Sequence, residues 1–113
     1  MVANRSGALL VLALAAFLEA YGDSSFQTAL YRSSGTRRVL AFLGGAACLV
    51  AYGLVVNTPR WDFGKLLGIY VVFFFLVAQG INWARFGQSP TLPVILGGAL
   101  IVAGGLIIAA FGR

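Results

Sequence analysis

An acidic residue inside an apolar segment is the feature of this sequence best able to do chemistry. Glu19 lies midway along residues 7–31, and Asp23 follows four residues later on the same side of a helix. An ionisable residue at the centre of a membrane-spanning helix costs roughly 2.5 to 3.5 kcal/mol on insertion scales, and such residues usually face a bundle interior or a cavity. Two ionised carboxylates one turn apart repel each other, so we expect coupled protonation. The pair therefore predicts a site for protons or a cation.

The residues around these acids favour a lipophilic cation as the ligand, because small residues leave space and aromatic faces attract cations. Proton and substrate binding is predicted for Glu19, Asp23 and Tyr70. A cavity lining is predicted for Ala15, Gly22, Phe26 and Phe74. The alternative for Asp23 is a hydrated position at the membrane interface. The alternative for Glu19 is a structural hydrogen bond between helices.

The elements that position these side chains follow from composition. Of 113 residues, 60% are hydrophobic and 10% charged, far outside the range of soluble globular proteins. One spanning helix takes about 20 apolar residues, so four spans use most of the chain. We predict an all-α membrane protein with one domain, residues 1–113, and four transmembrane helices. Their approximate spans are 7–31, 39–56, 66–83 and 93–111, and the short loops make consecutive helices antiparallel.

Several function classes are disfavoured by the residue inventory. The chain has no His and a single Cys, Cys48, which excludes an internal disulfide and an ordinary Cys/His zinc site. No motif for nucleophilic catalysis, phosphate binding or cofactor attachment is present. The net charge of +5 comes from basic residues scattered at the edges of apolar runs, a pattern of membrane anchoring rather than nucleic-acid binding. We therefore expect no enzyme activity, no cofactor, no metal and no nucleic-acid partner.

The first apolar segment also has the features of a signal peptide, because Arg5 precedes the apolar stretch 8–18. Cleavage would leave three spans and remove Glu19, so we prefer an uncleaved first helix.

Orientation in the membrane follows the distribution of Lys and Arg. The side of the N-terminus carries Arg5, Arg60, Lys65 and Arg113, and the other side carries Arg32, Arg37, Arg38 and Arg85. Four against four removes the usual bias, so two copies inserted in opposite orientations could assemble as an antiparallel dimer. The alternative is one fixed orientation, set for example by the Arg37-Arg38 pair.

Several motifs resemble those of the small multidrug resistance superfamily over nearly the whole chain. Near the acid, Leu18 to Gly22 places a glycine three residues after Glu19. The most specific match is Phe86-Gly87-Gln88, Leu92-Pro93, Gly97, Leu100-Ile101 and Ala103-Gly104. The resemblance implies an antiparallel, dual-topology homodimer that exchanges protons for cations. It assigns the essential carboxylate to Glu19, and dimer packing to Gly97, Leu100, Ile101 and Gly104.

The third helix departs from that pattern. Tyr70 stands where the superfamily has a substrate-facing tryptophan, and Val72 and Phe74 replace the glycines that usually follow it. Pro59 with Phe63-Gly64-Lys65 instead resembles the YnfA-like family of small membrane proteins. The chain is therefore identified as a divergent member of the superfamily.

The predicted function is proton-coupled export of small organic cations, such as drugs, with protons, the cation, membrane lipid and a second copy as partners. One alternative is a non-catalytic membrane subunit of a larger complex. Another is a subunit of a flippase for lipids or lipid-linked sugars. The resemblance implies a multi-pass protein of the bacterial inner (plasma) membrane.

Overall fold

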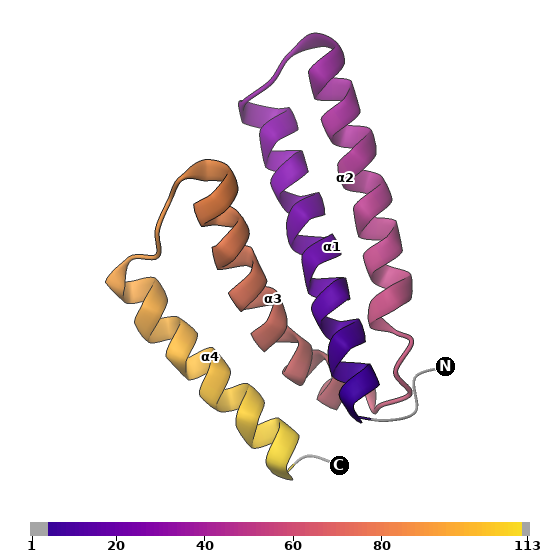
Figure 1. Ribbon diagram of the computed structural model, residues 1–113, viewed down its shortest axis with the longest axis vertical. Helices are drawn as coiled ribbons and strands as arrows, with labels where there is room; N and C mark the ends of the chain where they lie inside the picture. Colours follow the sequence, from indigo (N-terminus) through magenta and orange to yellow (C-terminus); the bar gives the residue numbers. More distant parts are fainter. Residues whose placement is uncertain (1–4, 112–113) are drawn as a thin grey trace.

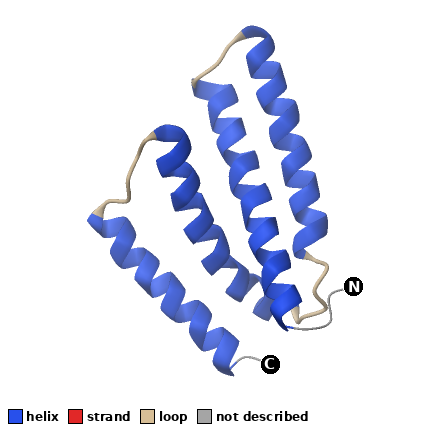
Figure 2. Ribbon diagram, in the orientation of Figure 1, coloured by secondary structure: helices blue, strands red, loops and turns tan. Residues whose placement is uncertain are grey.

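The computed structural model describes residues 5–111, which form four α-helices joined by short loops (Figures 1 and 2). The helices are α1 (Arg5–Tyr31), α2 (Gly35–Val56), α3 (Phe63–Phe86) and α4 (Leu92–Phe111). All four are long and apolar enough to cross a membrane. The prediction of an all-α, four-helix chain is therefore confirmed, and the four apolar helices indicate a multi-pass membrane protein.

Local backbone chemistry sets where the helices begin and end. Gly35 opens α2 with a φ of 61°, a conformation that costs glycine little. Asp62 caps α3, because its carboxylate accepts the backbone N–H of Lys65. Gly87 ends α3 in the left-handed region, with its N–H directed to the carbonyls of Asn82 and Trp83. All four helices begin before their predicted apolar spans, and α3 also ends beyond its span, at Phe86, because helical hydrogen bonding continues into the flanking residues.

Helix α1 lies at the centre of the packing. It contacts α2 on one side and α3 on the other, whereas α4 packs against α3 alone (Figure 1). Consecutive helices run antiparallel, as their short loops require. The core is formed by apolar side chains from the first three helices, namely Leu12, Ala15, Ala16, Val56, Leu66, Ile69 and Tyr70.

Glycines bring neighbouring helices close together at two contacts. A Cβ added at Gly22 of α1 would lie 3.0 Å from the carbonyl oxygen of Gly45 on α2, so these two backbones nearly touch. On α4, a Cβ at Gly98 would overlap Phe75, and one at Gly105 would overlap Val72. Small residues at a helix contact allow this close approach in membranes.

Gly98 and Gly105 each follow a second glycine, Gly97 and Gly104, which faces away from α3. A Cβ at Gly97 or Gly104 would have no atom of another described residue within 4 Å, apart from its own helix. Adjacent residues are turned by about 100° on a helix, so each glycine pair serves two different sides of α4. One strip packs inside the chain and the other remains open.

The basic residues gather at the two ends of the bundle. Arg5, Arg60 and Lys65 lie towards the end where α1 and α3 begin, and four arginines lie at the opposite end: Arg32, Arg37, Arg38 and Arg85. Arg113, the remaining basic residue of the predicted balance, lies outside the described residues. Basic side chains therefore flank the apolar helices, as expected for residues that reach the membrane surface.

Candidate functional site

A carboxylate and a phenol meet between the first and third helices. Glu19 is one residue past the midpoint of α1, and its Oε1 accepts a hydrogen bond of 2.8 Å from the hydroxyl of Tyr70 on α3. Tyr70 is only 5% exposed, so this bond forms at the edge of the core. The structure thus brings together two of the three residues predicted to bind protons and substrate.

The surroundings of this pair are apolar and aromatic. Ala15 and Ala16 of α1 are fully buried in the core cluster that contains Tyr70. The centroid of the Tyr70 ring lies 5.6 Å from that of Tyr52 and 6.4 Å from that of Phe74. A hydrogen bond to a charged group is stronger in such a low-dielectric environment than in water.

Within residues 5–111, no basic side chain forms an ion pair with Glu19. Its side-chain hydrogen bond comes from Tyr70. Asp23, its nearest acidic neighbour in sequence, only adds negative charge. A carboxylate in this position can bind a proton or the positive group of a ligand, because no cation of the described part of the chain competes for it.

Asp23 lines a cavity of about 200 Å³ between α1 and α3. Its side chain is exposed, and Gln27 and Asn82 add polar groups to the same cavity. Phe74 lines this cavity and also contacts the Tyr70 ring, so it connects the two places. Asp23 therefore lies at an accessible position beside the carboxylate–phenol pair.

Two of the residues predicted to line a substrate cavity, Gly22 and Phe26, pack against α2 within a single chain. Gly22 faces Gly45, and the ring of Phe26 lies 5.7 Å from that of Phe42. The physical reason is the central place of α1. The residues predicted to share one side of α1 are therefore shared between two neighbouring helices. Ala15 and Glu19 lie towards α3, whereas Gly22 and Phe26 pack against α2.

A cluster near the end of α3 was not predicted from the sequence. Arg85 donates hydrogen bonds to Ser24 Oγ at 2.8 Å and Ser25 Oγ at 3.2 Å, and its guanidinium lies 4.8 Å from the centre of the Tyr21 ring. The available signal was a pair of hydroxyls in an apolar helix, since such groups need partners in a membrane. Arg85 therefore joins the end of α3 to the part of α1 that follows Glu19 and Asp23.

The residues predicted for dimer packing lie on the outer part of α4. Gly97 and Gly104 face open space, Leu100 is 75% exposed and Ile101 is partly buried.

A metal site would need several ligating side chains close together. Within the described part of the chain, no group of three His, Cys, Asp or Glu side chains could hold a metal ion.

Fold and site together define a small multi-pass membrane protein with a carboxylate–phenol pair between its first and third helices. No protein-family model, no curated protein and no solved structure matches this chain. The resemblance to the small multidrug resistance superfamily therefore stays a prediction from its motifs.

Proposed function

We propose that this protein is a proton-coupled exporter of small organic cations, of the small multidrug resistance type. The observation that carries the proposal is the hydrogen bond between Glu19, near the middle of the apolar helix α1, and Tyr70 of α3. An ionisable residue at that depth is costly and usually serves a transport or proton pathway. The nearby aromatic rings of Tyr52 and Phe74 add cation–π attraction for a lipophilic cation.

Coupling follows from competition for one carboxylate. When Glu19 holds a proton, it is neutral and has little attraction for a cation. When a cation binds, the proton leaves for water on the side to which the site is open. The Tyr70 hydroxyl can donate to Oε1 in either state, so it holds the carboxyl group in place. Because proton and cation exclude each other, downhill proton entry drives cation export.

The working unit in this proposal is a homodimer with antiparallel copies in the bacterial inner membrane. The outer strip of α4 supports it, since Gly97 and Gly104 leave room for a second helix to approach closely. Basic residues at both ends of the bundle leave orientation weakly specified. Each copy would contribute one Glu19 to the shared transport pathway.

The test is substrate-driven proton flux in proteoliposomes with Glu19→Gln, which keeps the shape of the side chain and removes the charge. The panel contains quaternary ammonium compounds, aromatic cations and guanidinium. We expect loss of flux and of cation binding with Glu19→Gln, while the wild type transports at least one member.

Asp23→Asn is measured in parallel, because it removes an equal charge one turn away, at the second acid predicted to bind protons, and so shows which of the two acids is essential. We expect it to keep measurable flux. Proton-coupled transport that is unchanged by Glu19→Gln, or absent from folded wild-type protein with every cation, would contradict the proposal.

A further inference from the structure

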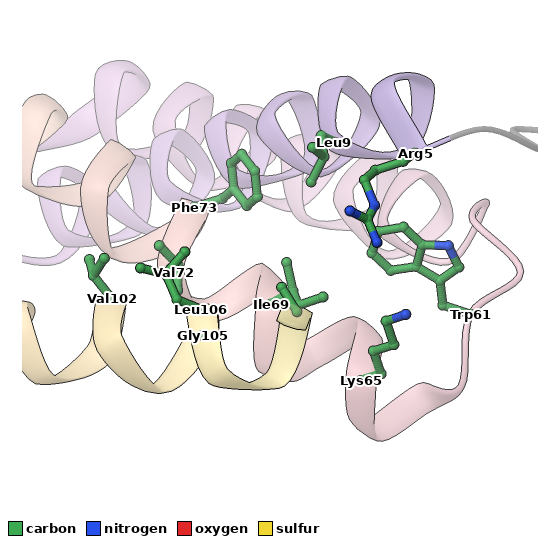
Figure 3. Close-up of a pocket in the computed structure, with 11 residues that line it drawn as sticks. Arg5, Leu9, Trp61, Lys65, Ile69, Val72, Phe73, Val102, Gly105 and Leu106 are labelled. Carbon is green, nitrogen blue, oxygen red and sulfur yellow. The ribbon is translucent and has the colours of Figure 1, made fainter. Parts of the chain in front are cut away.

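A groove at the other face of α3 is separate from the Glu19 site. It has a volume of about 280 Å³ and lies between α1, α3 and α4 (Figure 3). Its walls are mostly apolar and include Leu9, Ile69, Val72, Phe73, Val102 and Leu106. Because α1 and α4 flank α3 without contacting each other, α3 forms the floor and the groove opens between them.

One end of this groove carries two cations and an indole. Figure 3 shows the Arg5 guanidinium and the Lys65 ammonium directed towards Trp61, all at the same end of the apolar walls. The Lys65 nitrogen lies 5.3 Å from the centre of the Trp61 ring. The groove therefore has a long apolar part and a positively charged head.

No acid within residues 5–111 lines this groove. The nearest acid in sequence, Asp62, caps α3 by accepting the backbone N–H of Lys65 at 3.3 Å. The two cations therefore present net positive charge to a ligand lying between α1 and α4. A ligand that fits must combine an anionic group with an aliphatic chain.

We propose that this groove binds an anionic phospholipid, with one acyl chain along the apolar walls and the phosphate between Arg5 and Lys65. Both cations lie near the ends of membrane-spanning helices, at the depth of lipid headgroups, and tryptophan is enriched at that depth. Basic pockets between transmembrane helices bind acidic headgroups. A zwitterionic lipid fits less well, since its headgroup adds a cation beside two others.

The test is binding of phosphatidylglycerol and phosphatidylcholine to the purified full chain, titrated in detergent and measured by native mass spectrometry. Arg5→Gln/Lys65→Gln removes both cations of the groove. We expect affinity for phosphatidylglycerol to fall roughly thirtyfold, since each basic residue near a membrane surface contributes a factor of about five. Affinity for phosphatidylcholine is expected to change less than twofold.

Arg37→Gln/Arg38→Gln is the matched control, because it removes the same charge at the opposite end of the bundle. We expect it to leave phosphatidylglycerol binding within about twofold, since neither arginine lines the groove. An equal loss in both double variants would overturn the proposal, because binding would then depend on net charge alone.

A second measurement reports the acyl chain. The chain has two tryptophans, and Trp83 is exposed near the far end of α3, so Trp83→Phe leaves Trp61 as the single reporter. We expect phosphatidylglycerol with brominated chains to quench Trp61 more strongly than brominated phosphatidylcholine at equal concentration. Equal quenching by both lipids would overturn the proposal.

A second copy of the chain is the other possible occupant. Leu106→Cys, made with Cys48→Ser, places one thiol on the groove wall. Efficient disulfide formation between copies in lipid vesicles would show that a partner covers the groove and would overturn lipid binding. None of these measurements uses Glu19, so their outcome is independent of cation transport.

Discussion

The first and last helices use apolar residues in opposite ways. Helix α4 is the most apolar of the four, yet only Gly98 and Gly105 are buried in it. Helix α1 is the least apolar and has nine buried residues. In a water-soluble protein, the most apolar helix is expected at the core. The reversal shows that hydropathy in this chain measures contact with lipid and not burial inside the bundle.

The buried residues of α1 explain the reversal. All nine except Leu12 are alanine, glycine or serine: Ala8, Ala15, Ala16, Ala20, Gly22, Ser24, Ser25 and Ala29. Lipid tails are as apolar as leucine, so helices in a membrane gain little from burying large apolar side chains against one another. Close packing and hydrogen bonds hold them together instead. The centre of the bundle is therefore the place where polar groups such as Glu19 find partners.

The largest effect is expected when a side chain is added at the α1–α2 contact. A Cβ at Gly22 would lie 3.0 Å from both the Gly45 carbonyl oxygen and Leu49 Cγ, and backbone cannot move aside cheaply. Gly22→Val should lower the free energy of unfolding by about 3 kcal/mol, through overpacking. Thermal unfolding in detergent, followed by far-ultraviolet circular dichroism, measures this.

Gly97→Val on α4 is the control, because it adds the same side chain where no other described residue lies within 4 Å. In detergent, at a concentration where the chain is monomeric and dimer packing at Gly97 does not contribute, we expect its unfolding transition to stay near that of the wild type. If both variants lose the same stability, the contrast between a packed α1 and an open outer face of α4 is wrong.

A smaller effect is expected from comparing the two strips of α4. A methyl group at Gly105 would overlap the Val72 side chain, whereas one at Gly104 would meet open space. Gly105→Ala should destabilise the α3–α4 contact by roughly 1 to 3 kcal/mol. Gly104→Ala should leave unfolding of the monomer in detergent unchanged and reduce self-association, which chemical cross-linking in lipid vesicles would measure. Self-association reduced equally by both variants would remove the distinction between the strips.

The sequence predicted the four helices and the central acid for the same reason, namely that membrane insertion makes apolar length and lone charges conspicuous. Glu19 stood out because no other Asp, Glu, Lys or Arg lies so deep in a predicted span. The resemblance pointed to Tyr70 as well, although only the structure gives its hydrogen bond to Glu19.

The remaining contacts depend on the rotation of each helix, which hydropathy does not specify in a chain with lipid on most sides. Counting residues on one side of α1 placed Gly22 and Phe26 beside Glu19, but those two residues pack on α2. The contact of Arg85 with Ser24 and Ser25 likewise needs the register between two helices distant in sequence.

The smallest effect separates two tyrosines that lie side by side at the centre of the bundle. Tyr70→Phe removes the hydroxyl that donates a hydrogen bond to Glu19. Tyr52→Phe removes a hydroxyl that does not bond to Glu19, from a ring whose centroid lies 5.6 Å from that of Tyr70. We expect substrate-driven proton flux to fall roughly tenfold with Tyr70→Phe, because a hydrogen bond to a charged group is worth about 1.5 kcal/mol or more. Tyr52→Phe should change flux less than threefold, since the aromatic faces remain. Equal losses would mean that the two hydroxyls act only through packing, and Tyr70 would then have no special role in holding the Glu19 carboxyl group.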